Sequence, residues 1–484
     1  MKTKYIFLSA ILAAIAGGCA VGPDYHQPKT ETPAQWSEPL QGGETNSPAA
    51  VAWWENFHDA ELNSLIERAA RSNLDLRIAQ SRVREARAQY RIASANLWPT
   101  VGGSSSYARQ KESKNQPVLG SIPLPGNIPF QNNVYQAGFD ASWELDVFGG
   151  KRRAVESASA QVAATEFNQR DVLVILLGDV ARNYVELRGD QQRLAIAREN
   201  IKAQEEVLSI TRDRFEHGLT SDLDVEQAAT LLNSTRAEVP TLETSIENFV
   251  HRIGVLLGLQ PGALATELSS EAAIPVAPPT VPVGLPSDLL LRRPDVRQAE
   301  RQLASATANI GVAKADLFPK FSLTGVAGFQ SVSASDWFTA GSRFWSVGPT
   351  VTWKIFDAGQ IRANVRVQNA RQEQALAAYE QTTLTAFEDV ENSLVAYAKE
   401  QTRRRSLADA VTSSQNSLDL SKKLYTNGLT DFVNVLDAER SLYQAQDALV
   451  QSDRNVSTDV VSLYKSLGGG WENLASSPVL AQAK

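Results

Sequence analysis

The sequence predicts a mainly α-helical protein with long coiled-coil helices and a few strands that belong in a membrane β-barrel. Three observations favour this class: an internal twofold repeat, long heptad stretches, and segments in which apolar and polar residues alternate. The composition agrees, because 43% of the 484 residues are hydrophobic, which is enough for a large core. The net charge is 47 − 54 = −7 without a basic cluster, which argues against nucleic acid as a partner.

The composition also excludes several other classes of site. Cys19 is the only cysteine, so neither an intramolecular disulfide nor a cysteine-based metal site can form. The four histidines are far apart in the chain, so a local histidine metal motif is absent. After residue 20 no stretch offers the ~18 consecutive apolar residues of a transmembrane helix. A mature chain that spans a membrane must therefore do so with strands.

The amino terminus, residues 1–18, has the features of a secretory signal peptide. These are a positive start, an apolar core and small residues before the first cysteine: Lys2 and Lys4, 6–15 and 16–18. The small residues before Cys19 resemble a bacterial lipobox, which implies cleavage after Gly18 and a covalent lipid on Cys19. Ala20 in place of an aspartate favours the outer membrane. The alternative is an ordinary signal peptide with an incidental cysteine. The following residues, 19–59, are expected to form an extended, lipidated segment.

The rest of the chain contains two copies of one sequence repeat. The motif at 97–99 recurs at 317–319, an offset of 220, and later motifs recur at an offset of 210. The change of ten falls between residues 107 and 135, in a proline-rich interval that we expect to be a longer loop in the first half. The predicted organisation is a first repeat, a Pro-rich linker, a second repeat and a flexible tail: 60–258, 259–285, 286–471 and 472–484.

Each repeat is predicted to contain a helix, a strand, a loop, a strand, a long helix, a turn and a return helix. The first helix is expected over 60–96. A seven-residue spacing of apolar residues predicts a coiled-coil helix over 152–214, ~90 Å long. Its repeat is expected over 362–424, where Arg404 interrupts the spacing. Return helices of about 38 residues should follow the two glycine turns. A plain antiparallel coiled coil is the alternative, but it leaves the strands unexplained.

The strands are the informative part of each repeat. Residues 135–147 and 345–356 alternate apolar and polar side chains, with aromatic residues towards both ends of the apolar face: Tyr135, Trp143, Trp345 and Trp353. Their separation is ~26 Å along a strand, close to the ~25 Å apolar band of membrane barrels. Expected partner strands are about 100–110 and 320–330. A soluble β-sandwich is the alternative. Four strands cannot close a membrane barrel, so several copies must pool them.

Several motifs in this order resemble the outer membrane factors, the TolC-like and OprM-like exit ducts of tripartite efflux pumps. The similarity covers residues 15–471 and is greatest to the lipoprotein branch called NodT. The motifs are Cys19, 22–25 (GPDY), 53–59 (WWENFHD), 143–149 (WELDVFG), 291–297 (LRRPDVR) and 309–319 (NIGVAKADLFP). The resemblance implies a homotrimer whose four strands per protomer form a shared 12-stranded barrel in outer membrane lipid. It also implies a long periplasmic α-barrel, a periplasmic adaptor and an inner-membrane transporter of the resistance-nodulation-division type.

The function expected from this resemblance is passive efflux of small toxic compounds or drugs across the outer membrane. No catalytic constellation or phosphate loop is present, so we expect neither an enzyme nor a cofactor other than the lipid on Cys19. One alternative is the exit duct of a type I protein secretion system. Another is a structural periplasmic lipoprotein without a pore.

The resemblance also assigns residues to a periplasmic aperture and to contacts with the adaptor. Asp437 and Asn434 match acidic positions that ring the closed aperture, Asp224 lies on the first hairpin, and Tyr425 matches a latch tyrosine that could hydrogen-bond Asp224. The alternative is that the carboxylates are ordinary first-turn residues of helices. The hairpin tips match the adaptor contacts, although turn formation alone also explains them: Gly218, Leu219, Thr220, Gly428, Leu429 and Thr430.

Overall fold

The computed structural model describes residues 20–37, 44–45, 52–111, 113, 131–278 and 281–472. The signal peptide, Cys19 and the tail beyond residue 472 lie outside the described residues, so the predictions for them stay predictions. The chain divides into two compact units. Unit 1 comprises 1–28, 85–163 and 300–377, and unit 2 comprises 29–84, 164–299 and 378–484.

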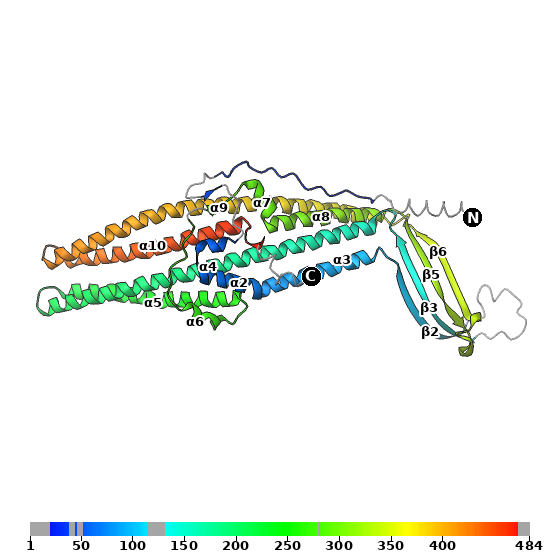
Figure 1. Ribbon diagram of the computed structural model, residues 1–484, viewed down its shortest axis with the longest axis horizontal. Helices are drawn as coiled ribbons and strands as arrows, with labels where there is room; N and C mark the ends of the chain where they lie inside the picture. Colours follow the sequence, from blue (N-terminus) through cyan, green and yellow to red (C-terminus); the bar gives the residue numbers. More distant parts are fainter. Residues whose placement is uncertain are drawn as a thin grey trace, which may run out of the picture. The chain divides into compact units, whose positions relative to one another are not determined.

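Unit 1 contains an antiparallel sheet of four strands in the order β2-β3-β5-β6 (Figure 1). The strands are β2 (Thr100–Lys111), β3 (Gln131–Leu145), β5 (Lys320–Ser331) and β6 (Arg343–Thr352). Two short 3₁₀ turns, η3 (Ala334–Asp336) and η4 (Ala340–Ser342), precede β6. Strands β2 and β6 are the edges, so each has one unpaired side within this chain.

Two pairs of long helices have matching lengths. Helices α4 (Gly150–Glu216) and α9 (Gln360–Thr426) have 67 residues each. Helices α5 (Asp222–Leu256) and α10 (Phe432–Ser466) have 35 residues each, slightly fewer than the sequence predicts. In unit 2, α4 turns into α5 and α9 turns into α10, which gives the two hairpins visible in Figure 1. No helix of the described residues combines the length and apolar character that a membrane crossing requires.

The single helix predicted over 60–96 is wrong, because the structure has two helices there: α2 (Ala60–Ser72) and α3 (Leu74–Ala95). Asn73 separates them in an extended conformation. Its buried side chain accepts a hydrogen bond from Leu76 N at 2.9 Å and donates one to Leu256 O at 2.8 Å. The second half breaks at the equivalent place, between α7 (Pro286–Arg292) and α8 (Pro294–Ala315), because Pro294 disfavours helical backbone before it.

The main core of unit 2 is built around the amino-terminal 3₁₀ turn η1 (Trp53–Phe57). Trp53 stacks on Tyr464 of α10 with ring centroids 5.3 Å apart, and both side chains are fully buried. The segment between the repeats forms η2 (Pro261–Leu264) and α6 (Ala265–Leu268), and β4 (Val281–Pro282) pairs in parallel with β1 (Glu44–Thr45). The core therefore joins the chain start, the linker and the ends of the hairpin helices.

Candidate functional site

One face of the sheet in unit 1 is apolar across all four strands. The register places Phe139 opposite Ala327 and Ala327 opposite Trp345, so alternate residues of neighbouring strands share this face. Its large side chains are exposed: Val101, Tyr107, Phe139, Trp143, Leu323, Trp345, Val347 and Val351. The register agrees with the alternation read from the sequence. An exposed apolar surface of this extent marks contact with a membrane or a partner.

The opposite face of the same sheet is polar. Asp140 of β3 lies opposite Gly102 and Val326, and Ser142 lies opposite Thr100 and Thr324. Further polar members of this face are Gln136, Glu144, Ser322, Gln330, Ser346 and Thr350. A sheet with one apolar and one hydrated face can separate lipid from water.

Aromatic residues occupy equivalent positions in the two strand pairs. The Trp143 indole N–H donates to Leu97 O at 2.9 Å, and that of Trp353 donates to Leu317 O at 3.1 Å. At the far end of the sheet, Tyr135 packs against two aromatic rings, those of Tyr107 and Trp337. The predicted girdle residues thus lie towards the two ends of the apolar face, although Trp353 follows the last residue of β6.

The segment directly after Cys19 is held against unit 1. Val21 N donates to Phe148 O at 3.0 Å, and Gly22 lies so close to Gly311 that a Cβ on it would come within 2.5 Å of the Gly311 Cα. Arg153 binds Asp24 at 2.6 Å and Glu156 at 2.7 Å. The hydrogen bond from Arg153 lowers the pKa of the Asp24 carboxyl. These contacts fix the chain from Val21 onward, two residues beyond the predicted lipid site.

Both hairpins end in the same turn. Gly218 and Gly428 have positive φ angles of 71° and 70°, a conformation that favours glycine. Leu219 N donates to Arg214 O at 2.8 Å, and Leu429 N donates to Leu424 O at 2.9 Å. The two leucines are 65% and 72% exposed. The turns therefore present an apolar side chain to the surroundings at each tip.

Of the predicted aperture residues, Asp224 lies in the first turn of α5, Asn434 and Asp437 lie in the first two turns of α10, and Tyr425 lies at the end of α9. Asp437 is exposed and forms an ion pair with Arg440 at 2.8 Å, three residues further along the same helix. Asn434 donates its side-chain amide to Thr430 Oγ1 at 2.8 Å. Asp224 closes a capping box with Ser221 and also accepts a hydrogen bond from the Thr220 hydroxyl. Two of these polar side chains thus stabilise helix starts, and Asp437 is balanced by a nearby cation.

The hydrogen bond expected between Tyr425 and Asp224 is not formed within the described chain. The Tyr425 hydroxyl is buried without a hydrogen-bond partner. Its ring packs against Phe432 with centroids 5.2 Å apart, and the Arg214 guanidinium of the other hairpin lies 4.8 Å from the ring centroid. Asp224 instead accepts hydrogen bonds from Thr220 and Ser221 of its own turn. Tyr425 joins the hairpins through its ring.

The apolar core near the tips has equivalent members from both halves. It contains Leu208 and Leu418, and four pairs in all are related by the 210-residue offset: 208 and 418, 225 and 435, 228 and 438, 232 and 442. All eight side chains are buried. The two hairpins therefore pack on each other with the same residue set.

A polar group missed by the sequence reasoning lies beside this core. The Glu439 side chain of α10 is buried, and burial raises the pKa of its carboxyl. Lys422 of α9 lies 3.0 Å from one carboxylate oxygen, but neither oxygen has a hydrogen bond of good geometry. The equivalent residue in the first half is Ala229. That substitution of an acid for an alanine was the available signal.

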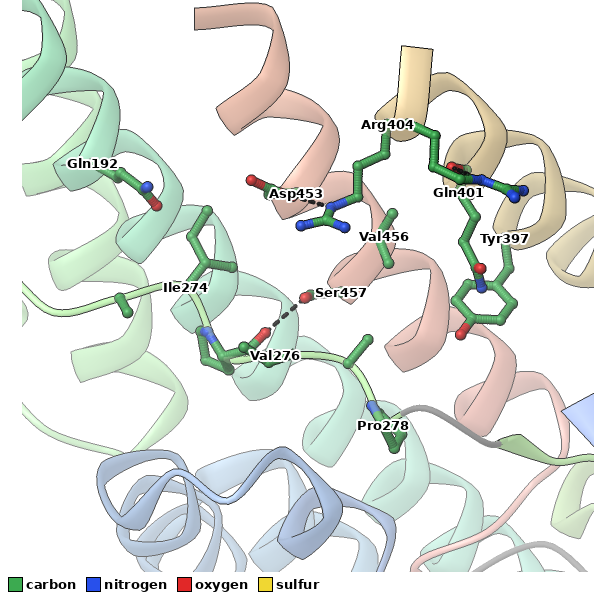
Figure 2. Close-up of a pocket in the computed structure, with 14 residues that line it drawn as sticks. Gln192, Ile274, Val276, Pro278, Tyr397, Gln401, Arg404, Asp453, Val456 and Ser457 are labelled. Carbon is green, nitrogen blue, oxygen red and sulfur yellow. Dashed lines mark hydrogen bonds and ion pairs between the residues drawn. The ribbon is translucent and has the colours of Figure 1, made fainter. Parts of the chain in front are cut away.

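A second polar group replaces part of the heptad seam further along the second hairpin. Arg404, which breaks the spacing in the sequence, forms an ion pair with Asp453 of α10 (Figure 2). The linker between the repeats passes the same place, and the Ser457 hydroxyl donates to Pro275 O at 2.7 Å. Together these residues line a groove of about 630 Å³. At this level of the second hairpin, α10 contacts Arg404 of α9 and the linker through polar side chains.

The model of the family described as outer membrane efflux protein matches residues 65–259 and 285–469. The solvent efflux pump outer membrane protein SrpC of Pseudomonas putida is 35% identical over 480 residues, which cover 97% of this chain and 99% of that protein. Nodulation protein T of Rhizobium leguminosarum bv. viciae is 33% identical over 463 residues, which cover 96% and 93%.

The fold is also similar to solved structures. The outer-membrane channel OprN superposes with a TM-score of 0.88 at 38% sequence identity. The match covers 94% of this chain and 100% of OprN. Both the helical hairpins and the strands therefore have counterparts in an outer-membrane channel.

Proposed function

This chain belongs to the outer membrane efflux protein family, and on that premise we propose that it forms the passive exit duct of a tripartite efflux pump. Its location is the outer membrane and its function is efflux. The main observation in favour of a duct is the four-stranded sheet of unit 1, which has one apolar face and one polar face. The cargo class is small toxic compounds, such as the solvents named for SrpC.

The assembled state is a homotrimer with a shared 12-stranded barrel. Its support is that β2 and β6 each have an unpaired edge, which lipid does not tolerate. Pairing β2 of one protomer with β6 of the next removes all edges when the ring closes. The internal repeat supports this arrangement, because equivalent strands and helices then alternate around the ring.

The mature chain is anchored by lipid on Cys19. The supporting observation is that the segment after Cys19 is fixed to unit 1 by the backbone hydrogen bond from Val21 N to Phe148 O and by the Arg153–Asp24 ion pair. The lipid would then project from the protein surface next to Gly149. Gly149 lies so close to Ala20 that a Cβ on it would come within 2.6 Å of the Ala20 Cα. Palmitate labelling of the wild-type protein and of Cys19→Ser tests this step.

The partners are a periplasmic adaptor and an inner-membrane transporter of the resistance-nodulation-division type. The adaptor would contact the two hairpin tips, where Leu219 and Leu429 are exposed. The aperture is formed near the start of α10, where three copies of Asp437 and Arg440 surround the threefold axis. Energy for transport comes from the inner-membrane partner.

Planar-bilayer recording of the purified protein tests the duct directly. We expect discrete conductance steps, whose size matches insertion of whole trimers. A protein that inserts as a folded oligomer without conductance would exclude the duct and favour a structural lipoprotein.

A further inference from the structure

An apolar groove lies on the outward, apolar face of the sheet, towards the end remote from the helices. Its floor consists of small residues from three strands, including Ser105, Ala137 and Ala327. Its walls are four aromatic side chains: Phe139, Phe329, Phe338 and Trp345. The groove has a volume of about 710 Å³. We expect an elongated apolar group to fill this groove better than a flat apolar surface would.

The groove wall at the far end is rigid. Phe338 lies between two other aromatic rings, stacked on Trp337 with centroids 4.8 Å apart and edge-on to Phe329 at 5.6 Å. The turn that carries Phe338 is tied by Thr339 and Ser342, whose hydroxyls both donate to Asp336 O. The wall is therefore preformed, so little conformational freedom is lost on binding.

Three basic residues lie on the apolar face at or beyond this end of the groove. Arg343 lines the groove itself, and Arg109 and Lys111 lie on the same face of β2. Within the described part of the chain, none of the three forms an ion pair or a side-chain hydrogen bond. Asp336 is the acidic residue of the described turn before β6. The far end of the apolar face is thus positively charged.

The helix end of the sheet shows the opposite arrangement. Lys151 pairs with Glu144 at 3.4 Å, and Lys320 pairs with Asp316 at 2.8 Å. Glu144 and Lys320 of these pairs lie on the polar face, whereas the three cations at the far end lie on the apolar face and form no ion pair among the described residues. If the helices lie in the periplasm, as the proposed function requires, the cationic end faces the outer leaflet.

We propose that this groove binds an acyl chain of a phosphorylated glycolipid of the outer leaflet, of the lipid A class, while Arg343 binds its phosphate. Arginine forms bidentate hydrogen bonds to phosphate, and basic residues beside apolar grooves recognise lipid head groups. Arg109 and Lys111 would contact the phosphates of neighbouring lipids on the same rim. The inference rests on the proposed function, because it needs the sheet to lie in the outer membrane.

Native mass spectrometry of the purified oligomer with added diphosphoryl lipid A tests the proposal. We expect Arg343→Gln to lower the retained lipid A about tenfold, as for loss of a charge-assisted hydrogen bond. Ala137→Phe, which fills the groove floor, should lower it as well. Arg366→Gln is the control, because it removes an exposed arginine of α9 outside the strands.

Three results would overturn the proposal. The first is unchanged lipid A retention in Arg343→Gln and Ala137→Phe. The second is an equal loss in Arg366→Gln. The third is wild-type retention of phosphatidylglycerol or dephosphorylated lipid A as strong as that of diphosphoryl lipid A. Conductance in lipid A-free bilayers is measured in parallel. If channels persist while lipid binding fails these tests, only the lipid site is wrong; if channels are absent, the duct itself is wrong.

Discussion

The two helical hairpins have the same frame but different interiors. Both consist of a 67-residue helix and a 35-residue helix joined by a glycine turn. In the first hairpin Leu194 and Leu242 pack together in a small apolar cluster. The equivalent residues of the second hairpin, 210 positions later, are Arg404 and Ser452. The Ser452 hydroxyl donates to Glu400 Oε1 at 2.5 Å, so a polar network replaces the leucine pair.

An apolar residue of the first hairpin is replaced by a polar one in the second at two further positions. Ala229 of the first hairpin corresponds to the buried acid Glu439, and Phe249 corresponds to Asp459. Burial, reinforced by Glu400, raises the pKa of Asp459 to about 6. Buried acids stabilise a core less than apolar side chains do. The frame of the duct is thus duplicated, but at these two positions the second hairpin carries an acid where the first carries an apolar side chain.

We expect the largest effects from substitutions in the strands, where equivalent residues of the two halves should respond alike. Val351 and its counterpart Ala141 lie on the apolar face. Val351→Arg and Ala141→Arg should each lower the free energy of unfolding in bilayers by about 2 kcal/mol or more, because an arginine faces lipid. Thr352→Arg and Ser142→Arg point to the hydrated face and should be tolerated.

Urea unfolding in vesicles measures these four variants. Loss of folded protein in the threonine and serine variants, with survival of the other two, would show that the assigned faces are reversed.

The turns should respond equally in both hairpins. Gly218→Ala and Gly428→Ala place a Cβ on a left-handed residue, which costs about 1–2 kcal/mol each. Apart from the adjacent residues, no described atom lies within 4 Å of the added Cβ at either site. Backbone strain is therefore the only loss of stability that we expect. Thermal unfolding followed by circular dichroism measures the change, and Asn variants are the milder control. Unequal losses would show that one turn has contacts the other lacks.

The stability of the second hairpin should depend on the protonation of Asp459. The Asp459 pKa is raised from 3.8 to about 6, so the folded chain binds more protons than the unfolded chain between these values. Its penalty is complete above about pH 7 and is relieved as the pH falls through 6 towards 4. Because the side chain is partly exposed, the gain on acidification should be about 1 kcal/mol.

Asp459→Asn tests this dependence in thermal unfolding between pH 7.5 and 5. We expect the variant to be more stable at pH 7.5 and less responsive to acid than the wild type. Asp453→Asn is a control that breaks the ion pair with Arg404 in the same helix. An unchanged pH response in Asp459→Asn would show that this carboxyl titrates normally.

Asp437 corresponds to Gln227 in the first hairpin, so Asp437→Gln makes the two tips more alike. The exposed pair with Arg440 contributes at most ~1 kcal/mol to stability. Its removal leaves an unpaired arginine, and we expect the channel to become more anion-selective. Reversal potentials across a KCl gradient measure the shift, and Arg440→Gln should shift them in the opposite direction. Unchanged potentials in both would place the pair away from the aperture.

The sequence predicted the approximate lengths of the long helices, the apolar face of the strands and the glycine turns, because each depends on local periodicity or backbone conformation. It missed features that depend on contacts between distant segments. Asn73 breaks a helix that its neighbours favour, because its side chain bridges to Leu256 O. Glu439 has the sequence surroundings of a surface residue and is buried only by neighbouring helices. The Asp437–Arg440 pair is an i, i+3 spacing on one helix, so the predicted acidic ring carries a basic residue beside each acid.

Tyr425 should show the smallest effect. Its counterpart is Phe215, so Tyr425→Phe makes the second hairpin match the first. The ring contacts with Phe432 and Arg214 remain, and the variant loses a buried hydroxyl that has no partner in this chain. We therefore expect stability to be unchanged or higher by up to ~1 kcal/mol, with unchanged resting conductance in planar bilayers. Asp224→Ala should cost about 1 kcal/mol through its lost helix cap, again without a change in conductance. A higher resting conductance in Tyr425→Phe would show that the hydroxyl binds a neighbouring protomer in the trimer, and it would restore this tyrosine as a latch.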